Sequence, residues 1–150
     1  MAMMMNETRI VLDGIPCQVY DASVNHLAEL LDGCQQVLAS HEQGAEVDPE
    51  LLDLVTHFVP DLEEVQQIFA AGQVTPVGDT CRVEVELQVG HDGAMAHLQM
   101  QLVQLRLLGR RAADLPQSDP ELMRFLKWAW DEFSDQLHGR AARPYGSRAM

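Results

Sequence analysis

The side chains whose types and spacing could support chemistry lie between residues 53 and 64. Asp53, His57, Asp61 and Glu64 are three or four residues apart, so a helix would place them along one side. An imidazole between carboxylates at this spacing could bind a divalent metal or act as a pH sensor. The simpler interpretation is an acidic surface in water, because Pro60 interrupts the register that metal ligands would need.

Two other groups of residues, one of histidines and one of cysteines, have side chains that could support chemistry. His91 and His97 lie on either side of Asp92, but nothing in the sequence fixes their geometry as metal ligands. Three widely spaced cysteines favour reduced thiols in a cytosolic protein: Cys17, Cys34 and Cys81. No Gly-x-Ser-x-Gly motif, glycine-rich phosphate loop or Cys-x-x-Cys pair is present. The sequence therefore predicts no catalytic residue, no metal, no cofactor and no enzymatic activity.

Composition and charge restrict the classes of partner. The chain has 150 residues, of which 47% are hydrophobic, and a formal net charge of −13. Residues 1–81 hold 14 acidic residues against a single arginine, whereas residues 82–150 hold nine residues of each sign. Nucleic acid and anionic membranes both require a basic face, so neither is an expected partner. No apolar run is long enough to span a bilayer and the N-terminus does not resemble an export signal, so we expect a cytoplasmic protein.

The elements expected from the sequence are strands at the start and in the middle, with helices elsewhere. A β-hairpin is predicted over residues 8–21 with its turn at Asp13-Gly14, and a helix of about 18 residues after Asp21. Asp48 and Pro49 form a strong helix start, and the apolar stripe of that helix keeps its phase across Pro60. We therefore expect two coaxial pieces or one kinked helix there.

The second half of the chain is expected to add one strand and two helices. Residues 70–79 read as a loop, and residues 81–89 alternate between apolar and polar as in a half-buried strand. Residues 94–108 could be a second strand or a helix, and their composition favours the helix. "DPELM" at 119–123 begins a last helix that runs to about His138. Residues 1–140 should form a single α+β domain, and residues 141–150 a flexible tail.

Trp128 is the one aromatic residue of the last helix that does not belong to its apolar stripe. On a helix, Trp128 lies among Arg124, Asp131 and Asp135, away from Phe133. Another segment of the same domain could cover it, or a cofactor could stack on it. Cover by the same domain is the simplest interpretation, and the functional hypothesis is an anchor for a partner protein or a second copy, because Trp often dominates binding energy. The predicted interface is Trp128 with four neighbours: Arg124, Phe125, Asp131 and Asp135. The acidic residues at 42–64 would favour a basic partner.

A pocket between sheet and helices is the alternative to a docking surface. Its lining would be Met95, Met100, Trp130 and Phe133, which would make the protein a sensor of a small ligand. The same residues are also ordinary core residues, so the sequence alone does not separate a pocket from a filled interior.

Both ends of the chain resemble a known family. "VLDGIPCQVYDASVNHLAELL" at 11–31, and "DPELMRFLKWAWDEFSDQLHG" at 119–139 followed by "RPY", resemble accessory regulatory proteins of actinobacterial sigma-factor partner-switching systems. The resemblance implies a signalling module that binds other proteins. The asparagine-bearing helix and glycine-rich loops of the kinases in those systems are absent, as is the Ser-Gly phosphorylation site of their antagonists. The resemblance therefore implies the accessory module alone.

Overall fold

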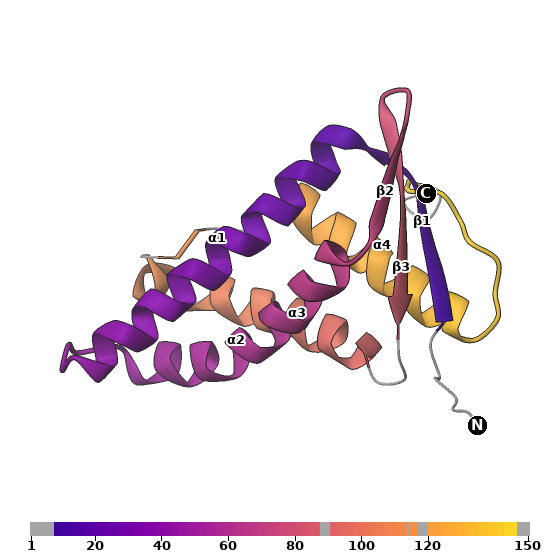
Figure 1. Ribbon diagram of the computed structural model, residues 1–150. Helices are drawn as coiled ribbons and strands as arrows, with labels where there is room; N and C mark the ends of the chain where they lie inside the picture. Colours follow the sequence, from indigo (N-terminus) through magenta and orange to yellow (C-terminus); the bar gives the residue numbers. More distant parts are fainter. Residues whose placement is uncertain (1–7, 88–90, 114, 117–119, 147–150) are drawn as a thin grey trace.

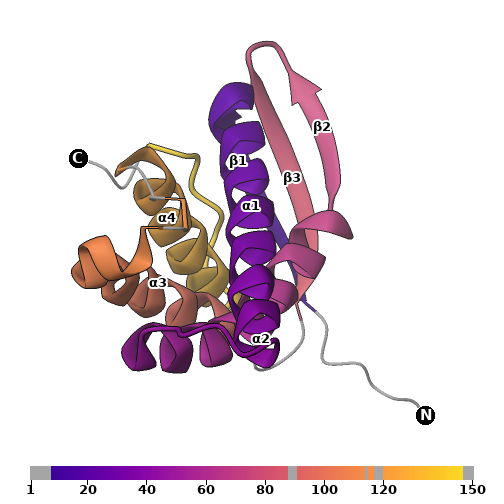
Figure 2. The same cartoon turned by 90° about the vertical axis from the view of Figure 1, so that its left-hand side faces the viewer.

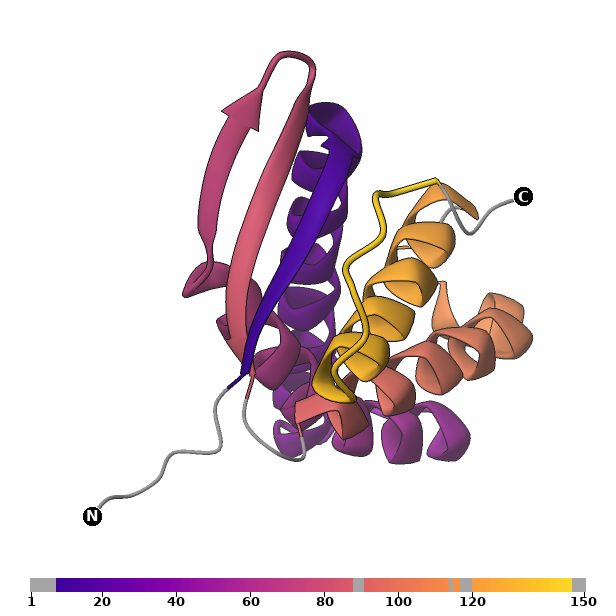
Figure 3. The same ribbon diagram turned by 90° about the vertical axis from the view of Figure 1, so that its right-hand side faces the viewer.

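The computed structural model describes residues 8–87, 91–113, 115–116 and 120–146. Its elements are β1 (Thr8–Pro16), α1 (Cys17–Glu42), α2 (Pro49–Ala70), β2 (Gln73–Val77), β3 (Thr80–Leu87), α3 (His91–Leu108), the 3₁₀ helix η1 (Gly109–Ala112) and α4 (Pro120–Leu137). The three strands form one antiparallel sheet in the order β1-β3-β2. The predicted α+β fold is confirmed. Figures 2 and 3 show α1 against one face of this sheet and α4 beside its β1 edge.

The N-terminal hairpin that we predicted is wrong. Residues 8–16 form the single strand β1, and the pairing with β3 shifts register between Leu12 and Ile15. Gly14 has a φ of 72° at this shift, and its amide donates to Asp13 Oδ1 at 2.9 Å. A glycine with positive φ suits a β-bulge as well as a turn. The expected second arm begins α1 at Cys17 instead, because Tyr20 and Leu27 are buried at helical spacing.

The sheet contains a hairpin of β2 and β3, and β2 and its turn lie in the segment 70–79 that we predicted to be a loop. β2 and β3 are joined through Gly78, whose φ is 62°, and Asp79. The hairpin tip extends beyond the helices (Figure 1). The strand predicted at 81–89 is confirmed as β3, with its alternate residues buried: Cys81, Val83, Val85 and Leu87. Residues 88 and 89 lie outside the described residues.

α2 is one continuous helix that contains Pro60. Its predicted start is confirmed, because Asp48 Oδ2 accepts a hydrogen bond from the Leu51 amide at 3.1 Å. Phe58 and Leu62, on either side of the proline, are both fully buried. Burial of such side chains contributes roughly 1.5–3 kcal/mol each, enough to offset the roughly 3 kcal/mol that a proline costs inside a helix.

The two helices predicted in the second half of the chain are present as α3 and α4. Residues 94–108 are helical and belong to α3, which ends before Gly109, a residue with a φ of 56°. The predicted capping residue Asp119 lies outside the described residues, and α4 ends at Leu137.

The segment after α4 corrects a further prediction. We expected residues 141–150 to form a flexible tail. Residues 147–150 lie outside the described residues, but the segment 141–146 runs alongside β1 and α4 (Figure 3) and is held there by hydrogen bonds and by packing of Tyr145. The Tyr145 amide donates to the Asp13 carbonyl at 2.8 Å, and the Arg143 amide donates to Glu132 Oε1 at 2.9 Å. We call residues 140–146 the C-terminal strap.

Candidate functional site

The predicted docking surface around Trp128 is wrong in its central residue. Only 4% of the Trp128 surface is exposed, and Phe125 is fully buried. Tyr145 of the C-terminal strap covers the indole, with ring centroids 5.1 Å apart at an angle of 84°. The covering residue is 17 positions away in the chain, so helical periodicity could not reveal it.

The charged residues predicted around Trp128 lie at the surface in local ion pairs. Arg124 is 3.2 Å from Glu121, Asp131 is 3.1 Å from Lys127, and Asp135 is 2.9 Å from Arg140. A hollow of about 560 Å³ is lined by Arg124 and Asp131 together with Trp128 and Tyr145. The indole Nε1 is buried and has no hydrogen-bond partner among the described residues. The described surface here pairs cations with anions, and Trp128 is too deeply buried to act as an exposed anchor.

The residues proposed for a ligand pocket do not come together. Met95 and Phe133 are fully buried in the core, whereas Met100 is 63% exposed and Trp130 is half-buried. Met95 and Met100 are five residues apart on α3, so they point about 140° apart around the helix. The pocket prediction is therefore wrong for this set of residues.

The acidic and histidine residues form pairs. His57 Nδ1 lies 3.8 Å from Asp53 Oδ1, and His97 Nδ1 lies 3.8 Å from Asp61 Oδ2. Within the described part of the chain, no three His, Cys, Asp or Glu side chains gather closely enough to hold a metal. The side chains of His91 and Asp92 lie outside the described residues.

The three cysteines are free, and two of them lie in the core. Burial raises the pKa of the Cys34 thiol to about 12 and that of Cys81 to about 11. Both thiols are therefore protonated at neutral pH and poor nucleophiles. Cys17 is half-buried at the start of α1.

An exposed apolar row on α3 was missed by sequence reasoning. Met100, Val103 and Leu107 are 63%, 48% and 81% exposed, and we call them the α3 ridge. The opposite side of α3 is buried through Leu98, Leu102 and Leu105. The signal was present in the sequence, since leucine, methionine and valine occupy both sides of the segment. It could not be recognised before the helix was established.

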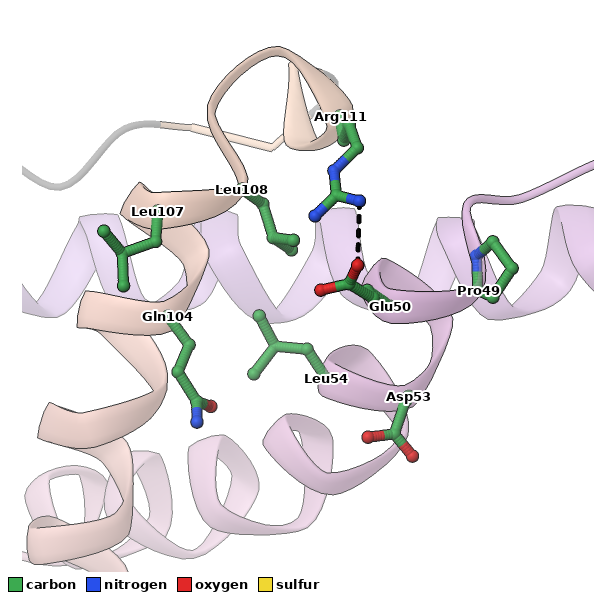
Figure 4. Close-up of a pocket in the computed structure, with 8 residues that line it drawn as sticks. All are labelled: Pro49, Glu50, Asp53, Leu54, Gln104, Leu107, Leu108 and Arg111. Carbon is green, nitrogen blue, oxygen red and sulfur yellow. Dashed lines mark hydrogen bonds and ion pairs between the residues drawn. The ribbon is translucent and has the colours of Figure 1, made fainter.

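The α3 ridge borders two hollows that α2 shares with α3. One of about 490 Å³ lies between Leu107 and Leu54, and one of about 510 Å³ lies beside Met100 and Pro60. Figure 4 shows the first, with Leu107, Leu108 and Leu54 around it and Arg111 turned towards Glu50. Arg111 Nη1 is 2.9 Å from Glu50 Oε1 and 3.7 Å from Asp48 Oδ1. Glu50 and Asp53 line the first hollow together with Leu107, so carboxylates lie on the α2 side of the ridge.

Comparison with known proteins adds no relative. No protein-family model, curated protein sequence or solved structure matches this chain. Within the described ranges, no helix combines the length and the apolar character needed to cross a membrane.

Proposed function

We propose that this chain is a non-enzymatic regulatory module of the cytoplasm that acts by binding protein through the α3 ridge. The observation that carries the proposal is the exposure of Met100, Val103 and Leu107 on one side of a single helix. Single exposed apolar residues are common on protein surfaces, but a contiguous row beside hollows is typical of an interaction site.

Burial of the ridge would supply part of the free energy of specific binding. Full burial of an aliphatic side chain contributes roughly 1.5–3 kcal/mol, and the three residues are 63%, 48% and 81% exposed. Covering the ridge would therefore contribute roughly 3–6 kcal/mol before the costs of association. The neighbouring hollows offer places into which side chains of a partner would fit.

The family resemblance supports a role in signalling, such as sigma-factor partner switching. Phe125 and Trp128, two aromatic positions that contribute to the resemblance, are buried. In this proposal they maintain the fold, whereas the α3 ridge binds the partner. A module of this kind would act by occluding or positioning another protein.

Site-specific crosslinking in the cells that produce the protein tests the proposal. A photoreactive amino acid at position 107 should give discrete protein adducts. The same amino acid at Val77, which is 57% exposed on β2 and lies away from the ridge, should give none of these adducts. Met100→Glu should abolish the adducts at position 107. Equal adducts at both positions, or none at position 107, would contradict the proposal.

A further inference from the structure

The spacing of the α3 ridge continues towards the start of the helix. Gly93, Ala96, Met100, Val103 and Leu107 are separated alternately by three and four residues. This is the seven-residue pattern by which two helices pack along a common seam. All five are at least partly exposed, so the seam is accessible along α3.

We infer that the α3 ridge binds a second copy of this chain, with the two α3 helices parallel about a two-fold axis. The inference rests on the proposed function and names the partner of the same surface. In this arrangement Met100, Val103 and Leu107 each contact their own counterpart in the second copy. The same surface of each copy therefore forms the interface, as in most dimers.

The two flanks of the ridge differ in their chemistry. α2 lies along one flank, where Gln101 Nε2 donates to the His57 carbonyl at 3.3 Å and His97 is 3.8 Å from Asp61. At about 100° per residue, Arg106 falls on the opposite flank of α3. Arg106 is exposed and makes no ion pair with any residue that the structure describes.

The α2 flank is acidic at the height of Arg106. Asp48 and Glu50 pair with Arg111 at the start of α2, and Asp53, which is 3.8 Å from His57, lines the same hollow as Arg111, so three carboxylates accompany one guanidinium there. Glu50 and Asp53 line the same hollow as Gln104 and Leu107 of α3, which are close to Arg106 in the chain. Each copy thus carries a net negative group on one flank and a cation on the other, at the same end of the ridge.

Charge selects the parallel arrangement. A two-fold axis parallel to α3 places the Arg106 flank of each copy against the α2 flank of the other, so that opposite charges approach. An antiparallel pair keeps α2 of both copies on the same side. It also reverses one helix relative to the other, so the acidic groups of the two copies lie at opposite ends of the seam and Arg106 faces no acidic group of the second copy. Only the parallel pair brings Arg106 to the acidic group, so it is favoured.

Sedimentation analysis over a range of concentrations tests the inference with purified protein. The wild type should dimerise, and Leu107→Glu should be monomeric with an unchanged far-ultraviolet circular dichroism spectrum. Val77→Glu places the same charge at an exposed aliphatic position outside the ridge and should remain dimeric. A monomeric wild type would overturn the inference, as would a Leu107→Glu variant that still dimerises.

Charge reversal tests the parallel arrangement. Arg106→Glu and Asp53→Arg should each weaken dimerisation about fivefold to tenfold, because each places like charges together. The double variant should recover most of the wild-type affinity. Glu29→Arg on α1, an exposed position away from the ridge, changes the net charge as Asp53→Arg does and should have little effect. Single effects that simply add in the double variant would refute the parallel pair.

The crosslinking and sedimentation results separate the two proposals. Adducts to a different protein at position 107, with a monomeric wild type, would support the proposed function and reject the second copy. An occupant of that kind would be a foreign helix with a basic group facing α2 and an acidic group facing Arg106.

Discussion

Gln136→Ala is expected to destabilise the protein far more than removal of one surface glutamine should. The Gln136 side chain accepts a hydrogen bond from the Val11 amide at 2.9 Å and donates to the Val11 carbonyl at 2.8 Å. Its Nε2 also donates to Glu132 Oε1 at 3.0 Å, and Glu132 is fully buried. Gln136 thus forms the backbone hydrogen bonds that a further strand would form at the outer edge of β1. It also donates a hydrogen bond to the buried carboxylate of Glu132.

The magnitude follows from these three bonds. A neutral hydrogen bond contributes roughly 0.5–1.5 kcal/mol net and one to a charged group roughly 1.5–3 kcal/mol. The two bonds to Val11 are only partly buried, so water can replace part of them and the lower values apply. The bond to Glu132 is also partly buried, and with its lower value the sum predicts a loss of roughly 2.5 kcal/mol in the free energy of unfolding.

Urea denaturation of matched variants measures this loss. Gln36→Ala is the control, because Gln36 is also a helical glutamine and its bond to Asp32 is exposed. That bond should contribute only about 0.2–0.5 kcal/mol. A loss for Gln136→Ala no larger than the loss for Gln36→Ala would show that Gln136 does not hold α4 to β1.

Three further predictions concern the strap, a buried thiol and the proline of α2. In a Trp130→Phe background, Tyr145→Ala should shift the fluorescence emission of Trp128 to longer wavelength, because the substitution removes the ring that covers the indole. An unchanged spectrum would mean that the strap does not shield the indole from water. Burial raises the pKa of Cys34 from 9.0 to about 12, so the folded state keeps this proton where the unfolded chain loses it. Stability should therefore fall as pH rises from 9.0 to about 12, and Cys34→Ala should make the urea midpoint depend less steeply on pH. An identical slope in the variant would argue against burial of the thiol. Pro60→Ala should raise the free energy of unfolding by about 1–3 kcal/mol in urea titrations by restoring a helical hydrogen bond, unless the exposed ring has a packing role.

The helices could be predicted from the sequence because their signals are local. Asp48 and Pro49 mark the start of α2 with a cap and a fixed φ, and the structure contains both. The strands were harder to place. Asp13-Gly14 suits a turn or a bulge equally, and only the burial of Ile15 and the helical packing of Tyr20 decide between them. β2 is exposed throughout, so it has no apolar alternation that would predict a strand.

Trp128 was wrongly predicted to be exposed, because the burial of a side chain depends on the whole fold and not on one helix. The periodicity of α4 places Trp128 away from the main apolar stripe of the helix. Periodicity describes one helix, however, and Tyr145 reaches Trp128 from the strap, which is fastened to β1 and α4. An exposed surface can be recognised only when every segment that could cover it has been placed.

The ambiguity of α3 and the proposed interface have the same physical origin. A helix that buries one side in its own domain needs polar residues on the other, and this contrast is what identifies it in a sequence. α3 buries Leu98 and Leu105 but exposes Met100 and Leu107, so the contrast is weak and its residues could also be assigned to a strand. Such apolar residues add nothing to the packing within the domain, and they increase the risk of unspecific association. Unequal charge on the two flanks of the ridge limits that risk, because only an orientation that brings Arg106 to an acidic group is favoured. The residues that made α3 difficult to assign therefore have a physical explanation as a contact surface, and the flanking charges determine which contact it accepts.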